Sequence, residues 1–176
     1  MDHDFITELL KPYQDVIGKH YPAYKNHVHR VVNLTLAIHQ EATEEDKTKI
    51  AIAGVFHDIG LWTASTFDYL DPSIAEVSKY LQSNGRDHWI EEIVMIINMH
   101  HKLSSYQGPF QRNVEPFRQA DLVDVSKGLV RFGVSKALLK ENARRYPMAG
   151  FIGILVRMFF TNLIKHPFKP LPMLKK

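Results

Sequence analysis

The chain has 176 residues, of which 45% are hydrophobic and 23% charged, and its formal net charge is +3. These values are typical of a soluble globular protein, most simply a single domain. The absence of cysteine excludes disulfides and thiolate ligands, so any metal must be held by His, Asp, Glu or water. No apolar run is long enough to span a membrane and no signal-peptide pattern follows Met1, so we expect a cytoplasmic protein.

The positive charge is concentrated at the C-terminal end. Between Lys136 and Lys176, nine Lys and Arg accompany the single acid Glu141, whereas the rest of the chain is net negative. A basic end favours an anionic substrate, a nucleic acid or a membrane surface, although a solvated basic face produces the same pattern. No nucleic-acid-binding motif accompanies it, and we expect no specific nucleic-acid partner.

Helical spacing of apolar residues organises the N-terminal part of the chain. A short helix is expected over 4–17 and a longer one over 23–40. In the longer helix one stripe of side chains combines a histidine with apolar residues: His27, Val31, Leu34 and Ile38. This stripe directs His27 toward the core, whereas His29 lies on a more mixed face.

The next helix is expected to end at a His-Asp pair. Thr43 is a suitable N-cap, and the acids that follow it suit a first helical turn. The apolar run that begins at Ala51 then stops at His57 and Asp58, with Gly60 just beyond. An imidazole and a carboxylate at the end of a buried helix are costly without a partner, and a divalent metal is the simplest one.

The remaining pattern is also helical, and no alternating strand pattern is present. We expect further helices over 71–85, 87–101, 115–127, 135–145 and 148–164. His100 and His101 close the second of these, and Asp121 faces the core on the third, with Asp124 on its flank. The last is apolar on more than one face, and we favour a core or homodimer helix over an interfacial membrane helix. The prediction is an all-α, single-domain helical bundle over 1–176.

The polar residues expected to face the core form a recognisable motif. His27-x-x-Arg30-Val31, then His57-Asp58-Ile59-Gly60, then Ala120-Asp121 resembles the HD superfamily of metal-dependent phosphohydrolases. The resemblance covers about 21–128, leaving a basic, apolar C-terminal extension at about 135–176. It implies a helical bundle of the HD-domain type and hydrolysis of a nucleotide or other small phosphate ester by a metal-activated water. It also implies four metal ligands: His27, His57, Asp58 and Asp121.

The number of metals and the catalytic groups follow from the same resemblance. Relatives with two metals usually carry a further His where this chain has Asp71-Pro72-Ser73, so we expect one ion of Mn, Zn, Fe, Ni or Co. Asp58 would orient the water, and His100 and His101 would bind phosphate or protonate a leaving oxygen. Candidate cationic phosphate contacts are Lys102, Arg112 and Arg118, and Arg30 suits either substrate or a structural ion pair.

Two other functions remain open at this point. One is a hydratase or other small-molecule lyase that uses the same metal site. The other is a non-catalytic regulatory HD module, although such a module would be expected to lose ligands and all four are present here.

Overall fold

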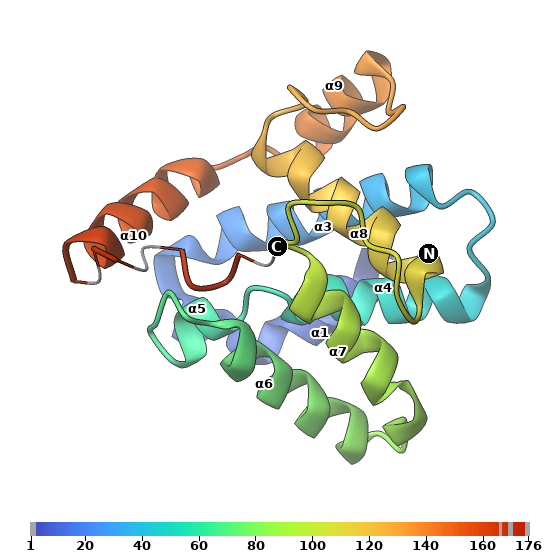
Figure 1. Ribbon diagram of the computed structural model, residues 1–176, viewed down its shortest axis with the longest axis horizontal. Coiled ribbons are helices and arrows are strands. Elements are labelled where there is room, and N and C mark those ends of the chain that lie inside the picture. The colour runs from blue at the N-terminus through green and yellow to red at the C-terminus, as the bar shows by residue number, and fades with distance from the viewer. Residues whose placement is uncertain (1–2, 166, 169–170, 175–176) are drawn as a thin grey trace.

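The computed structural model describes residues 3–165, 167–168 and 171–174. Helices make up 70% of it, and it contains no strand within the described residues, which confirms the all-α prediction (Figure 1). The α-helices are α1 (His3–Leu10), α2 (Gln14–Ile17), α3 (Tyr21–Ile38), α4 (Glu44–Phe56), α5 (Gly60–Thr63), α6 (Leu70–Ser83), α7 (Ile90–Met99), α8 (Gln111–Val125), α9 (Lys136–Arg145) and α10 (Phe151–Lys165). Three short 3-10 helices join them: η1 (Lys11–Tyr13), η2 (Gly18–His20) and η3 (Asp87–Trp89).

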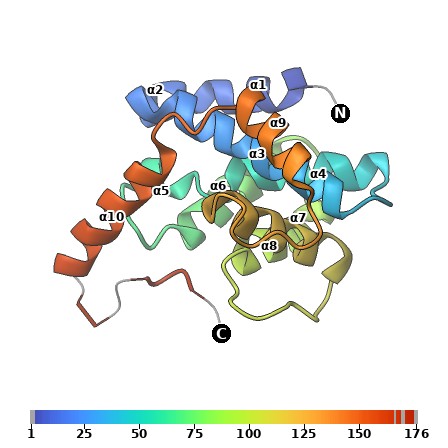
Figure 2. The same ribbon diagram turned by 90° about the horizontal axis from the view of Figure 1, so that it is seen from above.

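The three helices that carry the motif pack together at the centre of the bundle. α3 lies along α8 and also contacts α4, while α6 and α7 pair on the other side of α4 (Figures 1 and 2). The inward faces of α3 and α4 are fully buried and apolar apart from the motif residues, as Val28, Val31, Ile52 and Phe56 illustrate. Because these side chains are closely packed on all sides, the helices are held in fixed positions relative to one another, and so are their ends.

α4 begins and ends as its sequence indicates. The Thr43 hydroxyl accepts a hydrogen bond from the N–H of Asp46, and the Asp46 carboxylate accepts one from the N–H of Thr43, forming a capping box. The helix ends at Phe56, so His57 and Asp58 lie at its C-terminal end. This cap fixes where α4 starts and therefore where the His-Asp pair lies.

The glycine after the His-Asp pair allows α6 to pack closely against this turn. A Cβ at Gly60 would collide with the carbonyl oxygen of Tyr69 and lie 3.0 Å from Cβ of Pro72. The N–H of Gly60 donates to the buried hydroxyl of Ser73 at 2.9 Å. The α6 helix starts one residue earlier than expected, at Leu70, and Ser73 has a packing role against the turn.

The C-terminal helix is buried at its start and exposed along one side. Phe151 is fully buried, whereas Val156, Phe160 and Ile164 are 47%, 56% and 82% exposed at helical spacing. A homodimer through this helix stays a prediction. No described helix is long and apolar enough to span a membrane. The C-terminal extension expected over about 135–176 includes Pro170, which lies outside the described residues.

Candidate metal centre

The four expected ligands converge in the buried centre of the bundle. His27 comes from α3, His57 and Asp58 from the end of α4, and Asp121 from α8. Nε2 of His27 lies 3.0 Å from Nε2 of His57 and 3.5 Å from Oδ1 of Asp121. Nε2 of His57 lies 3.4 Å from Oδ2 of Asp58. None of the four is more than 4% exposed, so the cluster is almost fully buried.

Hydrogen bonds at the other ring nitrogen set the orientation of the imidazoles. Nδ1 of His27 lies 2.7 Å from Oδ2 of Asp124, and Nδ1 of His57 lies 2.8 Å from the carbonyl oxygen of Gly54. Nδ1 of His100 lies 2.6 Å from the carbonyl oxygen of Ile97. Because carboxylate and carbonyl oxygens only accept, each Nδ1 carries the proton. Each ring therefore directs its Nε2 at the cluster, the arrangement found in metal-ligating histidines.

The two later histidines occupy different positions around this cluster. His100 is 2% exposed, and its Nε2 lies 3.5 Å from Oδ1 of Asp58. The side chain of His101 is 22% exposed, and its Nδ1 lies 3.7 Å from Oδ2 of Asp121. Its Nε2 lies 2.5 Å from the hydroxyl of Tyr69. His100 therefore contacts the cluster from within the core, whereas His101 borders it on the side open to solvent.

The donor set suits a divalent cation. Oδ1 of Asp58 and Nε2 of His100 are buried without a hydrogen-bond partner, although both accept. Burial, reinforced by the carboxylates of Asp58 and Asp124, raises the pKa of Asp121 to about 8, so at neutral pH this carboxyl holds a proton unless a cation replaces it. Two facing imidazole lone pairs at 3.0 Å also need a positive charge between them. Ligand atoms of His27, His57 and Asp121 lie close enough to share one ion, as do those of His57, Asp58 and His100, and those of His100, His101 and Asp121.

Asp124 supports the cluster, a role that the sequence interpretation missed. Its carboxylate accepts from Nδ1 of His27 and from both Nε and Nη2 of Arg30, at 2.6 and 2.9 Å. Burial would raise the pKa of Asp124, but the hydrogen bonds from His27 and Arg30 outweigh it and lower the pKa. Arg30 also donates to the carbonyl oxygens of Tyr146 and Pro147. Arg30 is therefore a structural ion-pair partner, and its place one turn after His27 was the available signal.

Phe151 completes the packing around His27. Its ring stacks on the imidazole with centroids 4.1 Å apart and planes inclined by 20°. The start of α10 therefore covers the ligand face of α3, which the sequence pattern alone did not indicate.

A cavity of about 270 Å³ opens onto the cluster, and its walls are mostly apolar. Three polar residues line its inner end, namely Asp58, His101 and Asp121. The other lining residues come from the loop before α6, from α8, from α10 and from the segment after it: Phe67, Tyr69, Val125, Leu155, Val156, Phe159, Leu171, Met173 and Leu174. The apolar C-terminal helix thus forms one wall of the site.

The cations expected to contact phosphate are engaged elsewhere. The Arg118 guanidinium pairs with both carboxylate oxygens of Glu115, at 2.7 and 2.6 Å, and is 3% exposed. Arg112 donates to the carbonyl oxygen of Glu41 and to Nε2 of His39, which is buried. Lys102 donates to the hydroxyl of Ser104. Among the described residues that line the cavity, none is Lys or Arg.

Comparison with known families agrees with this geometry. The family model named HD domain matches residues 24–126, more than half of the chain. The chain therefore belongs to the HD domain family. No curated protein and no solved structure matches it. Membership of this family and the buried His/Asp cluster place the chain in a superfamily of metal-dependent hydrolases, whose domains bind divalent metals.

Proposed function

We propose that this protein is a metal-dependent hydrolase that holds one divalent ion through His27, His57, Asp58 and Asp121. One observation supports this most directly: two imidazoles and two carboxylates converge at a buried point, where Oδ1 of Asp58 has no hydrogen-bond partner. A bound divalent ion supplies a Lewis acid and lowers the pKa of a coordinated water toward neutrality.

The protein's own groups divide between positioning and substrate contact. Asp58 has one carboxylate oxygen near His57 and the other near His100, and it lines the cavity, so it suits orientation of a water. His101 lines the cavity, and the Tyr69 hydroxyl fixes its ring. Because His100 is buried against Asp58 and does not line the cavity, we assign it to the buried cluster and assign contact with the leaving group to His101.

The cavity supports a narrower substrate class than phosphate esters in general. Its volume is slightly below the roughly 300–1,000 Å³ common for ligand sites. Its walls are apolar and, within the described residues, lack the Arg and Lys that usually bind additional phosphates. We therefore propose a small phosphate monoester with an apolar or aromatic leaving group, in preference to a nucleoside triphosphate.

The same lack of lining cations favours a second candidate. An uncharged small molecule, such as a nitrile or an amide, would fit the apolar walls without needing a cationic contact. Hydration or hydrolysis of such a compound would use the same ligands and the same His101.

The first experiment is elemental analysis of protein purified without added metal, together with His57→Ala and Asp121→Ala. His88→Ala is the matched control, because His88 lies on the surface beside Trp89. We expect about one equivalent of a transition metal, retained in the control and lost in both ligand variants. Two equivalents would instead make His100 and His101 ligands. An absence of metal, with no thermal stabilisation by Mn, Zn, Fe, Ni or Co, would refute the metal-dependent function.

The second experiment compares four compounds as substrates of the metal-loaded protein: phenyl phosphate, ATP, benzonitrile and benzamide. Release of phosphate from phenyl phosphate at a higher kcat/KM than from ATP is the expected result. Turnover of benzonitrile or benzamide without turnover of phenyl phosphate would favour the second candidate. Faster hydrolysis of ATP than of phenyl phosphate would contradict the proposal that the apolar walls bind the substrate.

A further inference from the structure

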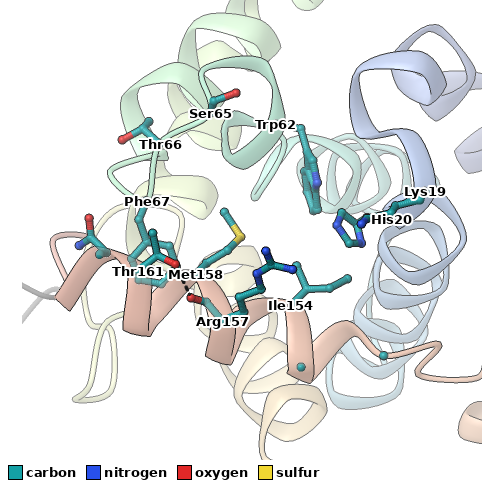
Figure 3. Close-up of a pocket in the computed structure, with 13 residues that line it drawn as sticks. Lys19, His20, Trp62, Ser65, Thr66, Phe67, Ile154, Arg157, Met158 and Thr161 are labelled. Atoms are coloured by element: carbon teal, nitrogen blue, oxygen red, sulfur yellow. Dashed lines mark hydrogen bonds between the residues drawn. The ribbon is translucent and has the colours of Figure 1, made fainter. Parts of the chain in front are cut away.

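A second and larger cavity lies between α10 and the turn that follows the His-Asp pair. Its volume is about 650 Å³. Lys19 and His20 of η2 border one side, Trp62 and the loop through Phe67 form another, and α10 closes it with Arg157 and Met158 (Figure 3). None of the residues assigned to the metal centre lines it.

The charged residues that line this cavity are all basic. Figure 3 shows the Arg157 side chain extending from α10 toward His20, with Lys19 beside it. Within the described part of the chain, no ion pair involves Lys19 or Arg157, and no lining residue is acidic. Burial, Lys19 and Arg157 together lower the pKa of His20, so the three basic groups interact electrostatically. Like charges around one cavity repel unless an anion lies between them.

The cavity is also lined by apolar and aromatic side chains. Trp62 points into the cavity from α5, and Met158 points toward it from α10 (Figure 3). Phe67 extends this wall, and hydroxyl groups of Ser65, Thr66 and Thr161 border it. A ligand that fills the cavity would therefore meet both cationic groups and apolar side chains.

Gly153 provides an independent indication that a ligand approaches α10. It lies in the first turn of the helix and lines the cavity, and a Cβ placed on it would meet no protein atom within 4 Å. Glycine destabilises a helix by about 1 kcal/mol relative to alanine, and no contact within the described structure requires it here. The missing side chain leaves room for a ligand beside the helix backbone.

We propose that this cavity is a binding site for a small organic anion, a carboxylate or a phosphorylated compound with an apolar ring. The anionic group lies among Lys19, His20 and Arg157, and the ring packs against Trp62 and Met158. This site is separate from the metal centre, and the proposal holds whether or not the proposed hydrolase activity is correct.

The intrinsic fluorescence of Trp62 reports on this cavity. The chain has two tryptophans, Trp62 and Trp89, and the Trp89→Phe variant leaves only the one that lines the cavity. The full-length variant is titrated with phenylphosphonate and with benzoate, and separately with inorganic phosphate and with benzyl alcohol. We expect saturable quenching or a spectral shift with at least one aromatic anion, and binding at least tenfold weaker for the uncharged alcohol and for inorganic phosphate.

The aromatic anion that binds more tightly identifies the preferred anionic group. Equal binding of benzyl alcohol, or no binding of either anion, would overturn the proposal.

Three variants in the Trp89→Phe background locate the bound anion. Arg157→Gln should weaken binding about tenfold or more, because an ion pair with hydrogen bonds is lost. Arg144→Gln, at an exposed arginine on α9, is the charge-matched control and should bind as before. Gly153→Ala should raise the Tm while weakening binding, a combination that a purely structural glycine does not produce. Binding that is insensitive to Arg157→Gln and Gly153→Ala but disappears on metal removal would place the probe at the metal centre and refute the site.

Discussion

The two cavities that border α10 differ in charge, and this difference determines which kind of ligand suits each cavity. The inner end of the smaller cavity presents the carboxylates of Asp58 and Asp121 beside imidazoles, and its described lining contains no Lys or Arg. The larger cavity presents Lys19 and Arg157, and its described lining contains no acid. The first therefore suits a cation deep inside and an apolar group at its mouth. The second suits an anion.

The comparison indicates which cavity the basic C-terminal region serves. Arg157 is part of the basic C-terminal region, yet it faces the cavity that is separate from the metal centre. An overall count of charges would have assigned the basic region to the substrate of the catalytic site. The positions of the charges in the fold instead assign Arg157 to the larger cavity and not to the metal centre.

The largest expected effect is loss of the metal from one cavity without change in the other. His57→Ala removes an imidazole ligand from the buried cluster, so metal content should fall below a tenth of an equivalent and hydrolysis at least a thousandfold. Binding of the aromatic anion, measured through Trp62, should stay within twofold. Loss of both properties in a variant with an intact helical spectrum would show that the cavities are not independent.

Asp124→Asn should weaken the metal centre less. The amide keeps the shape of the carboxylate but leaves the guanidinium of Arg30 buried without a charged partner, which costs about 3–5 kcal/mol of unfolding free energy. It also loosens the hold on His27, so metal affinity should fall about 10- to 100-fold. Urea unfolding and competition with a chelator measure the two effects. Asp87→Asn, at an exposed aspartate in η3, should change neither.

Tyr69→Phe should affect turnover but leave metal binding intact. The hydroxyl lies 2.5 Å from Nε2 of His101, and its loss frees the ring that contacts the leaving group. We expect kcat to fall about tenfold with metal content unchanged. Steady-state kinetics and elemental analysis on one preparation provide the test. An unchanged kcat would shift the proton-transfer role from His101 to His100.

Asp46→Asn should produce the smallest effect and touch neither cavity. Although burial opposes it, hydrogen bonds from Asn113 and Thr43 and the nearby Arg112 lower the pKa of Asp46 from 3.8 to about 2. A lowered folded-state pKa means that the charged form stabilises the fold above about pH 4 and that this contribution disappears as the pH falls toward 2. The free energy of unfolding of the variant should be about 1 kcal/mol lower at pH 7 because its cap is weaker. This difference should become progressively smaller between pH 4 and 2. Urea titrations at each pH, with Glu41→Gln as control, measure the difference.

Much of the fold was accessible from the sequence because its signals are local. The cap at Thr43 and the apolar run before His57 specify where α4 lies, and the stripe on α3 indicates which face is buried. Helix starts were less accurate. The sequence favours a cap at Asp71, whereas packing of α6 against Gly60 starts the helix at Leu70.

Only the part of the candidate site that follows from the sequence motif and from the buried face of each helix was predictable. The four expected ligands do converge, but the ion pair of Arg30 with Asp124 joins residues 94 positions apart, and no local pattern specifies it. The same holds for Phe151 on His27 and for the apolar cavity walls from the C-terminal segment. The engagement of Arg112 and Arg118 by other groups likewise depends on tertiary contacts.

Phe67 lines both cavities, and this has a thermodynamic consequence. A ligand of either cavity that displaces this ring also changes the shape of the other. If it alters the affinity there by some factor, the second ligand must alter the affinity of the first by that same factor, since the free energy of the doubly bound state does not depend on the order of binding. A single aromatic side chain thus gives this small bundle the means for reciprocal communication between two ligands.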